Sequence, residues 1–250
     1  MTRSKFLKNA HMYITACASW ERTPVNMASR ERYNMAIESI LEMMDSGYVP
    51  NGFSRVYEPD EVIWDKMYFC DDELHEYNIP KGIRHIGAEA FAGCSNLRKI
   101  RIPDTVESID YSAFAGCTSL EEITLPDSVW YVACDMCHDC TSLKSVKYTH
   151  SGAGIPLAAF AGCTSLTSIA IPDEVKYIGV QAFIRTALTS VVIPEKTIVC
   201  CDAFSENAKL QEAMFGNGAI IEHHAFFNCK NLSSISNLEN AEFIDPHAFG

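Results

Sequence analysis

One phrase recurs along this chain at a fixed interval. The copies are AFAGCSNLRKIRIP at 90–103, AFAGCTSLEEITLP at 113–126 and AFAGCTSLTSIAIP at 159–172. Successive copies are separated by about 23 residues or by twice that interval, which is the period of a repeat architecture. A unit this short cannot bury its apolar residues alone, and it becomes stable only when copies stack on one another. The sequence therefore predicts a solenoid in which every coil has the same architecture.

Two apolar columns extend the repeat along the chain. The aromatic column keeps nearly the same interval throughout and comprises Phe91, Phe114, Cys137, Phe160, Phe183, Phe204, Phe226 and Phe249. The leucine column, five or six residues later, comprises Leu97, Leu120, Leu143, Leu166, Leu188, Leu210 and Leu232. After each leucine, alternating apolar residues predict a short strand, often ended by a proline, which cannot donate to a sheet. Each coil then returns through a short turn or helix that carries the aromatic residue. Residues 61–250 are thus predicted to form a solenoid of eight or so coils, each of about 21–23 residues, the last of them incomplete.

The shared pattern of these copies is L-x-x-I-x-I-P-x-x-V-x-x-I-x-x-x-A-F-x-x-C. It resembles the BspA-like, bacterial surface-antigen type of leucine-rich repeat over roughly three quarters of the chain. The resemblance implies an α/β fold, a right-handed horseshoe-shaped solenoid with a parallel sheet on its concave face. It also implies a non-catalytic, adhesin-like or scaffold role in binding proteins or surfaces.

Residues 1–60 lie outside the repeat. They contain seven Lys/Arg and seven Asp/Glu, whereas residues 61–250 contain 13 and 25, so the whole net charge of −12 lies on the repeats. The apolar spacing between Tyr33 and Met44 predicts an amphipathic helix. We expect residues 1–60 to form a small helical N-terminal cap that covers the apolar end of the first coil. The alternatives are an independent module and a disordered leader.

The first residues also bear on location. Lys8, Asn9 and His11 interrupt the apolar stretch that a secretory signal requires, and no segment approaches the length of a membrane span. We therefore expect a cytoplasmic protein if Met1 is native, and a secreted or cell-surface protein if an export signal has been removed. Membrane insertion is expected in neither case.

The eleven cysteines suggest either disulfides or a metal site. Five of them share one column, three residues after the aromatic position, where we expect small, buried and reduced side chains: Cys94, Cys117, Cys140, Cys163 and Cys229. Residues 134–140, CDMCHDC, contain the C-x-x-C-H pattern of haem attachment and could also be a zinc site. Because the repeat directs Cys137 and Cys140 inward, we expect neither a metal nor a cofactor. A metal-binding or catalytic protein centred on residues 134–140 is the alternative.

Other chemistry finds little support in the sequence. There is no nucleophile elbow and no phosphate loop, and the pairs Cys200–Cys201 and His223–His224 have no third ligand at helical spacing. We therefore expect no catalytic residues. The acidic excess argues against nucleic acid, whose phosphates would be repelled.

The remaining expectation is recognition of a protein or peptide by the concave face. Residues flanking the inward positions of the strands should point into the hollow, and they grade from charged to apolar along the solenoid. The predicted contact residues are Lys99, Arg101, Glu122, Thr124, Lys147, Ala170, Val192 and Met214. The alternative is that these residues only suit a strand and have no partner. The incomplete last coil leaves end-to-end self-association open.

Overall fold

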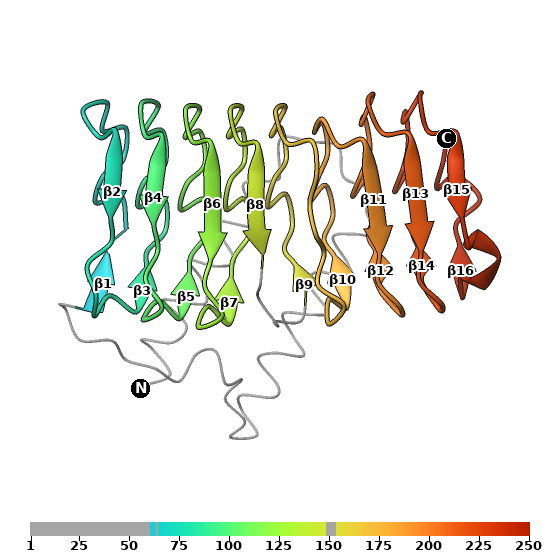
Figure 1. The fold of residues 1–250 in the computed structure, drawn as a ribbon, viewed down its shortest axis with the longest axis horizontal. Coiled ribbons are helices and arrows are strands. Elements are labelled where there is room, and N and C mark those ends of the chain that lie inside the picture. Colours follow the sequence, from blue (N-terminus) through green and yellow to red (C-terminus); the bar gives the residue numbers. More distant parts are fainter. Residues whose placement is uncertain (1–60, 64, 149–153) are drawn as a thin grey trace, which may run out of the picture. The chain divides into compact units, whose positions relative to one another are not determined.

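The fold is a stack of coils, each built around short parallel strands (Figure 1). A computed structural model describes residues 61–63, 65–148 and 154–250. These residues belong to one compact unit, Tyr57–Gly250. The helical cap predicted for residues 1–60 lies outside the described residues.

Two kinds of strand alternate along the chain. The short strands are β1 (Val62–Ile63), β3 (His85–Ile86), β5 (Ser108–Ile109), β7 (Tyr131–Val132), β9 (Gly154–Ile155), β10 (Tyr177–Ile178), β12 (Ile198–Val199), β14 (Ile220–Ile221) and β16 (Phe243–Ile244). The long strands are β2 (Glu76–Asn78), β4 (Lys99–Arg101), β6 (Glu122–Leu125), β8 (Ser145–Tyr148), β11 (Ser190–Ile193), β13 (Glu212–Phe215) and β15 (Ser234–Ser236). A 3-10 helix, η3 (Leu238–Asn240), precedes β16.

Strands of one kind pair in parallel between neighbouring coils. The short strands form the sheets β1-β3-β5-β7 and β9-β10-β12-β14-β16, and the long strands form β2-β4-β6-β8 and β11-β13-β15. Side chains of the long strands alternate between core and solvent, as in β6, where Ile123 and Leu125 are buried and Glu122 and Thr124 are exposed. The parallel solenoid of about eight coils is therefore confirmed.

The segment that carries the aromatic residue is a turn, and no α-helix occurs among the described residues. In the coil of Phe114, the amides of Ser112, Phe114 and Gly116 donate to carbonyl oxygens of the next coil, at 3.0, 2.9 and 2.7 Å. An amide bonded to the next coil cannot donate to the carbonyl four residues back, so a helix is excluded there. The expected α/β class is wrong for the described part of the chain, which consists of strands and turns.

The row of long strands is broken in one coil. The sequence predicts a strand with Ile169 and Ile171 inward, but residues 168–171 form no strand, and both isoleucines are only partly buried. In Figure 1 the row of long arrows is interrupted between β8 and β11. The preceding coil also departs from the repeat, because Tyr148 replaces the usual leucine or isoleucine and Thr149 replaces the proline.

Stacked rings fill the core of the solenoid. Phe160, Phe183, Phe204 and Phe226 are at most 1% exposed. Their ring centroids are 5.5, 5.2 and 5.1 Å apart in turn, and the rings are within 15° of parallel. Phe183 and Phe204 are thus each held between rings of the coils before and after them. The column is interrupted at Cys137, as its sequence indicates.

Removing one ring from the stack should destabilise the protein strongly. We expect Phe183→Ala to lower the free energy of unfolding by about 3–5 kcal/mol, because it leaves a cavity between two rings that cannot close up. Urea denaturation followed by circular dichroism measures the change. Lys209→Ala, at an exposed position, is the control and should alter stability by less than about 0.5 kcal/mol. Equal stability of the two variants would contradict the role of the stack.

Candidate functional site

The predicted contact residues lie on one face of the long strands, which we call the long-strand face. It consists of the outward side chains of β4, β6, β8, β11 and β13, with Ala170 in the coil that lacks a strand. Lys99 is partly exposed and the other seven predicted residues are exposed. The strand register places Glu122 beside Lys99, and Lys147 beside Thr124. The concave shape of this face and the role of these residues in binding stay predictions.

The N-terminal half of the long-strand face is charged. The ammonium nitrogen of Lys99 lies 3.6 Å from a carboxylate oxygen of Glu122 on the next strand. Lys99, Arg101, Glu122 and Thr124 line an open hollow together with Ile102. Because both signs of charge are present and exposed, this half suits polar contacts at the rim of an interface.

The C-terminal half of the same face is apolar. Val192 is 60% exposed and Met214 is 46% exposed, and the two residues are direct partners in the parallel register of β11 and β13. Ser190 precedes Val192 on the same face, and Ser236 is paired with Met214 on the other side. Two large apolar side chains therefore lie side by side in solvent, between hydroxyl groups.

The cluster at residues 134–140 does not form a metal site in this structure. Cys137 and Cys140 are fully buried, and the thiol of Cys140 lies 3.1 Å from the carbonyl oxygen of Phe114. His138 instead reaches solvent, where its two ring nitrogens lie 3.3 and 3.2 Å from carboxylate oxygens of Asp135 and Asp139. The thiols thus face the core whereas the imidazole pairs with carboxylates at the surface, so the ligands do not converge.

The cysteine column has a role that the sequence did not reveal. Each thiol in it lies within hydrogen-bonding distance of the carbonyl oxygen at the aromatic position one coil earlier, for example Cys117 to Phe91 at 3.1 Å and Cys163 to Cys137 at 3.2 Å. Asn207 occupies the same column and donates to the carbonyl oxygen of Phe183 at 2.7 Å. In these coils the column thus supplies a small hydrogen-bond donor rather than only a small apolar side chain.

Burial disfavours the thiolate form of three cysteines in the column. Loss of hydration raises the pKa of Cys140 and of Cys163 well above the usual thiol range, and the pKa of Cys229 rises to about 11 for the same reason. The ten described cysteines form no disulfide with one another. In the column, Cys94, Cys117, Cys140 and Cys163 are buried as expected, whereas Cys229 is only partly buried; their reduced state stays a prediction.

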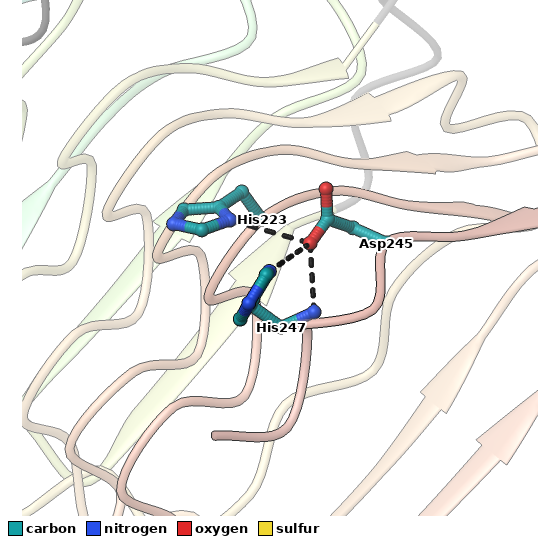
Figure 2. A group of neighbouring side chains, drawn as sticks. All are labelled: His223, Asp245 and His247. Atoms are coloured by element: carbon teal, nitrogen blue, oxygen red, sulfur yellow. Dashed lines mark hydrogen bonds and ion pairs between the residues drawn. The ribbon is translucent and has the colours of Figure 1, made fainter.

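A second group of neighbouring polar side chains was missed in the sequence. His223, Asp245 and His247 come together at the turns that follow β14 and β16, as Figure 2 shows. His223 has no third ligand at helical spacing in the sequence. In a solenoid, however, residues about one coil apart in the sequence become neighbours. Asp245 follows His223 by 22 residues, and His247 comes two residues after Asp245. This spacing is one residue short of the coil that separates Ile221 from Ile244, and it is the signal that would have found them.

Comparison with known proteins agrees with the fold. The repeats match the family described as BspA type leucine rich repeat region, with six copies over residues 62–157 and 133–250. No curated protein matches the chain.

Several solved structures are similar to the chain. A leucine-rich repeat protein from Eubacterium ventriosum is 25% identical with a TM-score of 0.50, and the match covers 70% of this chain and 42% of that one. One from Bacteroides ovatus is 20% identical with a TM-score of 0.40, over 76% and 72% of the two chains. A leucine rich cell surface protein from Faecalibacterium prausnitzii is 22% identical with a TM-score of 0.37, over 69% and 62%. The chain thus spans less than two thirds of the Eubacterium and Faecalibacterium proteins.

The state of the thiols can be tested by alkylation. In the folded protein, iodoacetamide should modify the exposed Cys70, whereas Cys117, Cys140 and Cys163 should react on the order of a hundredfold more slowly, because their thiolates do not form and reagent cannot reach them. Peptide mass spectrometry follows each site over time, and a sample in urea supplies the rates of the unfolded chain. Reaction of the column cysteines at the rate of Cys70 would contradict their burial.

Proposed function

Because the chain belongs to the BspA-type leucine-rich-repeat family, we propose that it is a non-catalytic protein-binding module that uses its long-strand face. Leucine-rich solenoids present an extended surface of strand side chains, and such surfaces bind other proteins rather than perform chemistry. On this proposal the face is the concave side of a right-handed horseshoe. The partner is a protein or peptide, and the role is adhesin-like or that of a scaffold.

The observation that carries this proposal is the exposed pair Val192 and Met214. Apolar side chains next to each other in water have a free-energy cost that a partner removes by covering them, at about 25 cal/mol for each Å² of apolar surface buried. Interfaces are typically organised in this way, with a desolvated apolar centre and a polar rim. Ser190, Ser236 and the charged residues of β4 and β6 would form the rim.

Two locations are compatible with this function. Membership of the BspA type supports the cell surface, whereas the lack of disulfides among the described cysteines supports a reducing compartment such as the cytoplasm. Within the described residues, no helix combines the length and apolar character needed to cross a bilayer.

Protease shaving of intact source cells separates the two locations. Peptides of this chain released from whole cells place it on the surface, and peptides found only after lysis place it inside. End-to-end self-association stays a prediction.

The function is tested by charging the apolar pair. We expect Val192→Asp combined with Met214→Asp to weaken partner binding at least about a hundredfold, because two carboxylates would be buried without counter-charges. The midpoint of thermal unfolding should stay within a few degrees, since both side chains are exposed. Immobilised wild-type chain first captures the partner from source-cell extracts or surface fractions, and the purified partner is then titrated against each variant.

The matched control places the same charges elsewhere. Met67 and Phe69 are 53% and 47% exposed and lie outside the long strands, so Met67→Asp combined with Phe69→Asp should leave partner binding unchanged. If the charges at Val192 and Met214 also leave binding unchanged, the long-strand face is not the binding surface.

A further inference from the structure

The turns at the C-terminal end of the short-strand sheet carry a site of different chemistry. Strands β14 and β16 are in register, with Ile220 beside Phe243 and Ile221 beside Ile244. The residues that follow the two strands therefore lie next to each other. Two hydrogen bonds hold the backbone there. The amide of Asp245 donates to the carbonyl oxygen of Ile221 at 2.8 Å, and the amide of His224 donates to the carbonyl oxygen of His247 at 3.2 Å.

These turns direct two imidazoles at one carboxylate (Figure 2). One carboxylate oxygen of Asp245 lies 3.2 Å from Nδ1 of His223 and 3.6 Å from Nδ1 of His247. One ligand atom from each of the three residues can be chosen so that all lie within 4.8 Å of one another. Ligand atoms that share a zinc ion are separated by roughly 3.0–3.5 Å, because each lies about 2.0–2.2 Å from the metal. Small side-chain rotations would therefore suffice to place the three atoms around one ion.

Neighbouring groups hold the ligands in place. The backbone amide of His247 donates to the same Asp245 oxygen at 2.8 Å. This hydrogen bond is the main reason why the pKa of Asp245 lies below its usual range. The imidazole of His224 lies against that of His223, with centroids 3.8 Å apart, and the ring of Phe227 lies 4.7 Å from that of His224. Such contacts restrict the orientation of a ligand side chain and favour binding by reducing the conformational entropy lost on association.

We propose that His223, Asp245 and His247 bind one divalent transition-metal ion, with zinc as the best match. Two imidazoles and one carboxylate suit zinc and similar borderline ions, whereas magnesium and calcium require oxygen ligands throughout. All three side chains are open to solvent, with exposures of 49%, 25% and 65%, so an ion can enter directly. Three protein ligands leave at least one coordination position for water or for a donor atom of a bound molecule.

Without a metal, the same side chains make only polar contacts between the imidazoles and the carboxylate. Affinity and ligand identity distinguish the two cases. The metal proposal is independent of partner binding, because its residues follow the short strands and lie outside the long-strand face.

The test is calorimetric titration of the tag-free, EDTA-treated full chain with zinc chloride. We expect one equivalent to bind, whereas magnesium and calcium chloride give no binding under the same conditions. His223→Ala, His247→Ala and Asp245→Asn should each weaken zinc binding at least about tenfold, because each removes one ligand. Circular dichroism should be unchanged, since all three substitutions are at the surface.

The matched control is His138→Ala, which removes a second surface histidine that contacts two aspartates. It should leave the stoichiometry and affinity for zinc unchanged.

Cobalt substitution identifies the ligands independently, because nitrogen and oxygen ligands give no thiolate-to-cobalt charge-transfer band in the near ultraviolet.

Two results would overturn the proposal. One is the absence of saturable zinc binding by the wild-type chain, or binding that is equal in the wild type and in a variant that lacks both His223 and His247. The other is a thiolate charge-transfer band that accounts for the bound cobalt, which would place the metal on cysteines.

Discussion

Bonding between successive coils is the interaction on which the rest of this structure depends. In the aromatic turns the amides of alternate residues, such as Ser112 and Phe114, donate to the next coil rather than within their own. The rings of Phe183 and Phe204 add apolar contact along the same direction. A coil without neighbours would therefore leave its amides unbonded and its aromatic ring in water. Stability in such a stack depends on interfaces between neighbours, so damage at one interface weakens the adjoining coils most.

The cysteine column shows how the stack meets its own hydrogen-bonding needs. The carbonyl oxygens of Phe91 and Cys137 each accept one backbone amide, at 3.2 Å, and have room for a second donor. Cys117 and Cys163 supply a weak donor in little space. Asn207 supplies two stronger hydrogen bonds at the same place, to Phe183 and Phe204. The preference for cysteine is thus explained by size and donor capacity together, without disulfides and without a metal.

The stacking also determines where surface chemistry can arise. Residues at equivalent positions of successive repeats become neighbours. A cluster of surface side chains is therefore assembled from successive coils rather than from residues three or four apart in the sequence. Val192 and Met214 form the apolar pair on the long strands in this way. His223 and Asp245 also come from successive coils beside the short strands, but they are one position out of register, because Ile221 is level with Ile244. The two surfaces belong to different sheets, so a substitution in one need not disturb the other.

The sequence by itself determined the solenoid, the inward and outward residues of the strands and the burial of Cys137 and Cys140. It could do so because stacking turns a position in the repeat directly into a position in space. Only the tertiary structure decided that the aromatic segment is a turn, since this depends on which carbonyl each amide reaches. It also decided that residues 168–171 leave the sheet, where the repeat itself is irregular. The convergence of His223, Asp245 and His247 is likewise tertiary, because it depends on the direction of side chains in turns that the repeat pattern does not specify.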